Sequence, residues 1–179
     1  MTLPQTLPQG VVLTQLQTYP DSRGTFCELF RQSWVPQISF VQWNLVVSEA
    51  NSLRGVHVHF THSDYLTVVQ GHLQLGLIDL RGDSPTVGLS VVVDLRTATA
   101  QTILIPPGVA HGFWFPEQTT CLFGVSHYWD VDDEKGCLYS DPELGFGWEN
   151  LNQPMVSAKD ARLPSLKTLR ESHPLIRRP

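Results

Sequence analysis

The distribution of hydrophobic positions predicts a series of short strands. Stretches rich in Val, Leu, Ile, Thr and aromatic residues are bounded by Gly, Pro, Asp and Ser, a pattern typical of strands joined by turns. Residues 72–80 (HLQLGLIDL) alternate with a period of two, which places Leu73, Leu75 and Leu77 on one face of a strand. The expected strands cover residues 11–19, 25–30, 39–47, 56–60, 65–70, 72–80, 89–95, 102–106 and 120–129.

This series of strands predicts the fold class. Many short strands in a chain of 179 residues indicate an all-β sandwich or barrel of the jelly-roll kind, and we expect one domain over residues 1–179. Only residues 157–173 (SAKDARLPSLKTLRESH) have a helical pattern, and Pro164 interrupts it. The C-terminal part of the domain is therefore expected to be a short helical segment.

Composition and charge narrow the class of protein. The net charge of −5 provides no basic surface for nucleic acid, although a few arginines in a cleft can still bind phosphates. No apolar run is long enough for a transmembrane helix, and residues 1–10 (MTLPQTLPQG) lack the pattern of a signal peptide. Cys27, Cys121 and Cys137 are widely spaced and odd in number, as in a reduced chain. We expect a cytoplasmic protein that binds neither membranes nor nucleic acid.

Histidines are concentrated in residues 53–64 (LRGVHVHFTHSD). Alternate side chains of a strand share a face, so His57 and His59 are expected to project together into the interior of a small barrel. His62 lies in a turn-like THSD sequence and is interpreted as an ordinary polar residue. His111 follows a Pro-Pro-Gly turn much later in the chain. The barrel interior is therefore expected to contain several imidazoles.

These histidines lie in sequences that resemble the two signature motifs of the cupin superfamily. The residues that match are His57, His59, Asp64 (where Glu is usual) and Gly71 in the first motif, and Pro106, Gly108 and His111 in the second. In metal-binding cupins these motifs supply the ligands, and imidazoles with a carboxylate suit Fe, Mn, Zn or Cu. One interpretation is therefore a metal-dependent dioxygenase or isomerase with His57, His59, Asp64 and His111 as ligands.

A longer resemblance points to a different branch of the cupins. From residue 10 to residue 170 the chain resembles the dTDP-4-dehydrorhamnose 3,5-epimerase family. The similar segments, in the family's order, are DSRGTFCELF, FVQWN, LRGVH, DLRGDSPT, IPPGVAHGF, DPELGFGW and SAKDARLPSL. The resemblance implies a cupin jelly roll that forms a homodimer, binds a nucleotide sugar, most simply a dTDP sugar, and needs no metal or other cofactor.

The family's reaction implies a role for two residues. A base removes a proton beside the C4 ketone of a nucleoside-diphosphate 4-keto-6-deoxyhexose, at C3, at C5 or at both, and an enolate forms. His57 in LRGVH occupies the position of the base, and a neutral histidine suits this task near pH 7. Asp160 in SAKD occupies the position of the carboxylate that orients it. Ser157-x-x-Asp160 also resembles a helix capping box, which is a purely structural alternative.

The same resemblance implies a set of substrate-binding residues. Arg54 matches an arginine that binds the diphosphate in the family. A guanidinium suits this role because it can donate two parallel hydrogen bonds to a phosphate. His111 is expected to polarise the ketone or to hold the sugar. The remaining positions, some of which reach across the family dimer, are Arg23, Glu28, Gln42 and Asn44 for the nucleotide and Phe123, Tyr128 and Trp129 for the aromatic walls.

Three departures from the family pattern change the expected chemistry. Phe123 replaces the tyrosine that returns the proton, Asp64 replaces a lysine beside the ketone, and His59 replaces a glutamine. The proton donor is then Tyr128, His59 or water, or only one carbon is inverted.

Two other functions share the nucleotide-sugar substrate. Sugar-nucleotide 3,4-ketoisomerases carry Arg-Gly-x-His-Ala-His, which residues 54–59 resemble with Val58 in place of Ala, and in them both histidines (here His57 and His59) move protons. Those chains are typically shorter and lack segments such as DPELGFGW. The second alternative is a barrel that binds a sugar nucleotide without converting it.

Overall fold

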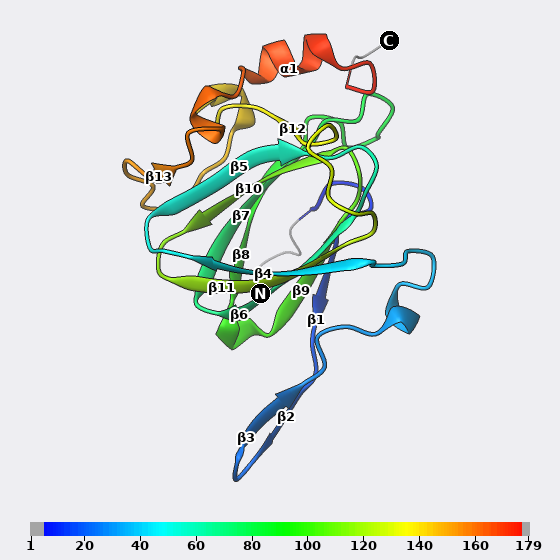
Figure 1. The fold of residues 1–179 in the computed structure, drawn as a ribbon, viewed down its shortest axis with the longest axis vertical. Coiled ribbons are helices and arrows are strands. Elements are labelled where there is room, and N and C mark those ends of the chain that lie inside the picture. Colours follow the sequence, from blue (N-terminus) through cyan, green and yellow to red (C-terminus); the bar gives the residue numbers. More distant parts are fainter. Residues whose placement is uncertain (1–5, 177–179) are drawn as a thin grey trace.

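Two β-sheets form the body of the computed structural model, which describes residues 6–176 (Figure 1). The five-stranded sheet has the order β1 (Val12–Gln15), β9 (Gln101–Ile105), β6 (Asp64–Gln70), β11 (Thr119–Val125) and β4 (Gln42–Ser48). The six-stranded sheet has the order β12 (Lys135–Gly136), β5 (Ser52–Val58), β10 (Val109–Phe115), β7 (His72–Asp79) and β8 (Ser90–Arg96), with β13 (Met155–Val156) parallel to β5. Neighbours in each sheet are mostly distant in sequence, so the chain crosses repeatedly between the layers.

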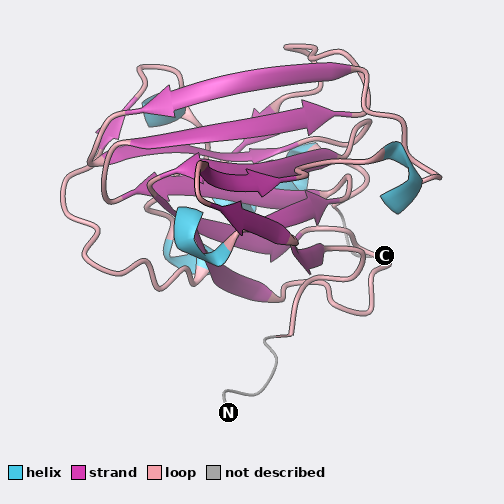
Figure 2. Ribbon diagram, turned by 90° about the horizontal axis from the view of Figure 1, so that it is seen from below, coloured by secondary structure: helices cyan, strands magenta, loops and turns pink. Residues whose placement is uncertain are grey.

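The remaining elements are small. A hairpin of β2 (Thr18–Asp21) and β3 (Gly24–Cys27) projects away from the two sheets (Figure 1). Within residues 6–176, helical structure is confined to α1 (Leu166–Ser172) and to 3-10 turns at Gln32–Trp34, Thr97–Thr99, Pro142–Leu144 and Asp160–Arg162. Strands dominate the view from below (Figure 2). The expected all-β jelly-roll class is confirmed. Among the described residues, no helix is long and apolar enough to cross a bilayer.

The alternation of residues 72–80 explains where the core lies. Leu73, Leu75 and Leu77 are fully buried among the apolar side chains between the two sheets. Ile78, on the opposite face of β7, packs in a second cluster that includes Leu166 of α1. Each such side chain contributes about 1.5–3 kcal/mol when fully buried. The second cluster holds the C-terminal segment against the outer face of the six-stranded sheet.

Several boundaries differ from the sequence prediction. β5 begins at Ser52 and ends at Val58, so His59 lies just beyond the strand. The prediction omitted β10, which carries His111. Pro164 does divide the C-terminal helical segment, as expected, and α1 begins after Ser165, whose hydroxyl accepts a hydrogen bond from the Thr168 N–H at 3.1 Å. The single domain over residues 1–179 stays a prediction, because residues 1–5 and 177–179 lie outside the described part.

A buried carboxylate organises the loop that follows β7. Asp79 is completely buried, and its two oxygens accept hydrogen bonds from Arg81, Ser84 and Thr86. Burial alone would raise the pKa of Asp79, but these hydrogen bonds outweigh it and lower the pKa. The carboxylate is therefore charged at neutral pH, and the loop donors are satisfied by it.

Replacing Asp79 with alanine should lower the free energy of unfolding by about 3–5 kcal/mol, because Arg81 loses its buried partner. Urea unfolding at pH 7 measures this change. Asp83→Ala, an exposed position in the same loop, is the matched control and should change stability by no more than about 0.5 kcal/mol. The pKa of Asp79 in the folded protein lies below its ordinary value of 3.8. The difference in free energy of unfolding between wild type and Asp79→Ala should therefore be complete above that pH and shrink as the pH falls below it. Equal stability of Asp79→Ala and wild type at pH 7 would contradict this account.

Candidate active site

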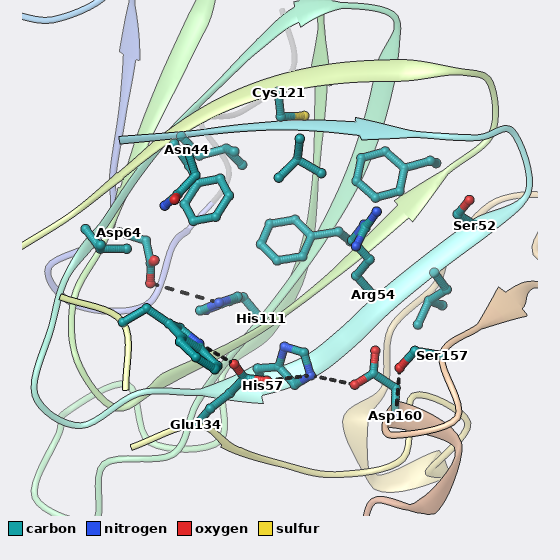
Figure 3. A pocket seen from close by; sticks show the side chains of 18 of the residues that line it. Asn44, Ser52, Arg54, His57, Asp64, His111, Cys121, Glu134, Ser157 and Asp160 are labelled. Carbon is teal, nitrogen blue, oxygen red and sulfur yellow. Dashed lines mark hydrogen bonds and ion pairs between the residues drawn. The ribbon is translucent and has the colours of Figure 1, made fainter. Parts of the chain in front are cut away.

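A cavity of about 890 Å³ opens between the two sheets (Figure 3). Strands β4, β5, β6, β10 and β11 contribute its walls, and the segments around Glu134 and Asp160 close one side. Phenylalanines at positions 113, 115 and 123 make part of the wall apolar, while imidazoles and carboxylates gather at one end. Sites of this size, with an apolar wall and a few convergent polar groups, are typical of small-molecule binding.

His57 and Asp160 form a dyad at the edge of this cavity. The distance between His57 Nε2 and Asp160 Oδ1 is 2.7 Å. The second carboxylate oxygen of Asp160 accepts a hydrogen bond from the Gly55 N–H at 3.2 Å, and the Asp160 N–H donates to Ser157 Oγ at 3.0 Å. β13 pairs with β5 just before this segment and brings it alongside the strand of His57. Residues 103 positions apart are thereby held in contact.

The charge of Asp160 determines which ring nitrogen of His57 carries the proton. Burial would raise the pKa of Asp160, but hydrogen bonds from His57, Gly55 and Ser157 outweigh it and lower the pKa. An ionised carboxylate can only accept, so Nε2 of His57 must carry the proton that it donates. In the neutral ring the other nitrogen then has a free electron pair, and it faces the cavity interior (Figure 3). This is the form that a general base requires.

Glu134 is a second carboxylate beside His57 that the sequence analysis missed. Its Oε1 lies 3.6 Å from His57 Nε2, and its Oε2 accepts a hydrogen bond from Trp129 Nε1 at 2.7 Å. Lys159 also pairs with Glu134. Burial would raise the pKa of Glu134, but the hydrogen bonds from Lys159 and Trp129 outweigh it and lower the pKa. Both carboxylates around His57 are therefore negatively charged.

A second cluster of titratable groups lies deeper in the same cavity. His59, His62, Asp64 and His111 are all buried and all line it. The rings of His59 and His62 stack with their centroids 4.1 Å apart. His62 was interpreted from the sequence as an ordinary turn residue, yet only 2% of it is exposed. No local pattern indicates this burial, because residues 61–64 (THSD) are all polar.

Burial sets the charge of this cluster. Burial, reinforced by His111 and His62, lowers the pKa of His59 to about 2, and burial together with His57 lowers that of His111 to about 3. Burial likewise raises the pKa of Asp64 to about 8. The imidazoles are therefore uncharged at neutral pH, and His59 has no imidazolium proton to donate.

Other predicted residues also meet in the cavity. Arg54 lines it, and its Nε donates a hydrogen bond to Ser48 Oγ at 3.0 Å, which fixes the guanidinium. Gln42 joins two further predicted residues, since its amide donates to Asn44 Oδ1 at 2.9 Å and accepts from the Trp129 N–H at 3.1 Å. Phe123 and His111 are also among the lining residues.

The structure does not bring three predicted residues into this cavity. Arg23 is at the tip of the β2–β3 hairpin, where its side chain is 89% exposed and pairs with Asp21. Glu28 pairs with Arg31. Tyr128 is 74% exposed and is not among the residues that line the cavity, so its role as the proton donor stays a prediction.

The fold and the dyad together have the form of an enzyme active site, in which a carboxylate pairs with a histidine that faces a ligand-sized cavity. A family model described as dTDP-4-dehydrorhamnose 3,5-epimerase matches residues 5–168, and the chain belongs to this family. It is therefore an isomerase of the epimerase type, a sugar-nucleotide epimerase, as the sequence resemblance implied.

Three similar proteins illustrate the relationship. The dTDP-4-dehydrorhamnose 3,5-epimerase of Salmonella typhimurium is 31% identical over 165 residues, which cover 87% of this chain and 90% of that protein. The enzyme of Neisseria gonorrhoeae is 31% identical over 157 residues, 84% of this chain but only 48% of that protein. A crystal structure from Legionella pneumophila, in complex with dTDP-4-keto-L-rhamnose, is 28% identical, covers 94% of this chain and 93% of that one, and has a TM-score of 0.86.

Proposed function

We propose that this protein epimerises a dTDP-linked 4-keto-6-deoxyhexose at C3, C5 or both, with His57 as the base. The observation that carries the proposal is the dyad, in which Asp160 holds the His57 ring through Nε2 and leaves the other ring nitrogen facing the cavity (Figure 3). The Legionella relative, whose structure contains dTDP-4-keto-L-rhamnose, supports the choice of substrate.

The proposed reaction begins with the acidity of the substrate. The ketone acidifies the neighbouring C–H because the resulting carbanion delocalises into an enolate. His57 takes this proton and becomes an imidazolium, which the charged Asp160 and Glu134 stabilise at 2.7 and 3.6 Å from Nε2. Return of a proton to the opposite face inverts the carbon. Because Tyr128 is outside the cavity and His59 is uncharged, we propose water as the proton donor, and the hydroxide that remains takes the proton held by the His57 imidazolium.

The cavity offers complementary groups for the rest of the substrate. Arg54 can bind the diphosphate with two parallel N–H donors, and the hydrogen bond to Ser48 limits the loss of side-chain entropy on binding. Trp129 and Phe123 supply aromatic surface for the nucleobase and the sugar of the substrate. We therefore place the nucleotide near Arg54 and the ketone near His57.

A labelling experiment tests this function. The protein is incubated with dTDP-4-keto-6-deoxyglucose in D2O, and NMR locates the deuterium in the product. Label at C3 and C5 indicates double epimerisation, and label at one carbon indicates single epimerisation. Conversion to a 3-keto sugar would instead assign the ketoisomerase function, and tight binding without exchange would assign a non-catalytic barrel.

We also propose that the active form is a homodimer built on the edge strand β4. This edge exposes Val41, Trp43, Leu45 and Val47, an apolar row that a second copy can cover. Arg23 and Glu28, outside the cavity of their own chain, would then contribute to the cavity of the partner. The unpaired cysteines fit a cytoplasmic enzyme, and we propose no membrane or nucleic-acid partner.

Replacing Leu45 with aspartate should convert the dimer to a monomer, because a charge would enter the apolar interface. Light scattering coupled to size exclusion measures the mass of each species. Val12→Asp is the matched control, since Val12 is also exposed but lies on β1 at the opposite edge of the same sheet. A Leu45→Asp protein that remains dimeric would place the interface elsewhere.

A further inference from the structure

We propose that His59, His62 and Asp64 form a binding site for a divalent transition-metal ion, with His111 at its margin. This site is separate from the His57–Asp160 dyad and does not depend on the epimerase reaction. It also differs from the ligand set suggested by the cupin motifs, because His62 takes part and His57 does not. The resemblance to the epimerase family implied no metal, whereas the cupin motifs left a metal site with that other ligand set as an alternative.

The spacing of the ligand atoms supports the proposal. One ligand atom from each of His59, His62 and Asp64 lies within 4.8 Å of the other two. His62 Nε2 is 3.7 Å from Asp64 Oδ1, and His111 Nε2 is 4.0 Å from Asp64 Oδ2. Both separations are too long for hydrogen bonds. Two ligand atoms that share an ion at about 2.1 Å each lie about 3–4 Å apart, so the separations of Asp64 from His62 and His111 suit an ion.

The hydrogen-bonding roles of the imidazoles also indicate an ion between Asp64 and the histidines His62 and His111. Nδ1 of His111 lies 3.3 Å from the carbonyl oxygen of Val109, and Nδ1 of His62 lies 3.4 Å from a carboxylate oxygen of Asp133. Both partners are acceptors, so each Nδ1 is the protonated nitrogen. The Nε2 atoms of His62 and His111 then present electron pairs to the oxygens of Asp64. Acceptors that face one another need a cation or a proton between them.

The burial of the cluster strengthens this requirement. Asp64 is 8% exposed, and among the described residues its carboxylate accepts no hydrogen bond. His59 is also 8% exposed, and its Nδ1 has no hydrogen-bond partner in the described part of the chain. A buried nitrogen without a partner, such as His59 Nδ1, is costly, and an ion could satisfy it.

Asp133 provides the support that metal-binding histidines usually have. A carboxylate on the second ring nitrogen fixes the orientation of a ligand histidine and raises its basicity. Asp133 is itself held by the N–H groups of Phe60 and Thr61, at 3.1 and 3.2 Å. Two imidazoles with one carboxylate favour Zn²⁺, Co²⁺, Ni²⁺ or Fe²⁺ over Mg²⁺ or Ca²⁺, which prefer oxygen ligands.

Cobalt and zinc provide direct probes. The purified, chelator-treated protein is titrated with Co²⁺, and the visible absorption of bound Co²⁺ and calorimetry with Zn²⁺ report affinity and stoichiometry. We expect one ion per chain, retained in His57→Asn, and at least a 100-fold loss of affinity in His62→Ala and Asp64→Asn. Asp133→Asn should weaken binding by about 10–100-fold, as loss of such a supporting carboxylate does.

His127→Ala is the matched control, because His127 is exposed and near His62 but outside the cluster. Circular dichroism establishes that each variant is folded before titration. Absence of Co²⁺ and Zn²⁺ binding in the wild type overturns the proposal and assigns the gap to a proton on Asp64. Binding that persists in folded His62→Ala and Asp64→Asn overturns it equally. Neither result depends on epimerase activity, so failure of one proposal is distinguishable from failure of the other.

Discussion

Deuterium exchange into the sugar should fall by at least about 10³-fold when His57 is replaced by asparagine. The amide has a similar size and can still contact Asp160, but it has no basic nitrogen to take the proton from carbon. Without that step the enolate does not form at either carbon. NMR of dTDP-4-keto-6-deoxyglucose incubated in D2O measures the exchange rate directly.

Two controls separate chemistry from binding and folding. His57→Asn should retain its affinity for dTDP, measured by calorimetry, because Arg54 and the aromatic walls are unchanged. His127→Asn removes an exposed histidine and should exchange at the wild-type rate. Exchange at the wild-type rate in His57→Asn would remove this residue from the reaction.

Replacing Asp160 with asparagine should lower kcat by about 10²–10⁴-fold with little change in nucleotide affinity. The variant keeps the shape of the dyad but loses the charge that fixes the tautomer of His57 and stabilises its imidazolium. It can also turn its NH₂ group toward Nε2, which would force the proton onto the nitrogen that must act as the base. Steady-state kinetics of the same substrate measures the loss.

Glu134→Gln is the comparison that tests the assignment of the two carboxylates. Glu134 lies farther from His57 Nε2, at 3.6 Å against 2.7 Å for Asp160, and its charge is shared with Lys159. We expect this variant to lose no more than about 10-fold in kcat, because its interaction with the imidazolium is weaker. A larger loss in Glu134→Gln than in Asp160→Asn would reverse the two roles.

The fold was predictable where a strand has one face toward the core. The alternating leucines of residues 72–80 identified β7, and runs of Val and Ile identified β8 and β9. β10 was missed because VAHGFWF is buried almost throughout and interrupted by Gly112, so it has no alternation of polar and apolar residues. The order of strands in the sheets is set by contacts between distant segments, which no local pattern encodes.

The site was predictable only in part, for a similar reason. Arg54, His57 and Asp160 occur in short segments that resemble a known family, and the structure brings all three to one cavity. Glu134 lies in an acidic run, DVDDEK, that is typical of an exposed loop. Contacts with Trp129 and Lys159 hold Glu134 in the site. A local sequence pattern cannot predict such contacts.

The placement of Asp160 has a consequence for chains that lack the C-terminal segment. Every strand of the two sheets except the short β13 precedes residue 137, whereas the carboxylate that orients the base follows near the C-terminal end. A chain cut by a protease before residue 155 loses this carboxylate and also Leu166 and Leu169, which pack in the second core cluster. We therefore expect the proposed proton transfer to require the whole C-terminal segment, which supplies the charge of Asp160 and also covers the outer face of the six-stranded sheet.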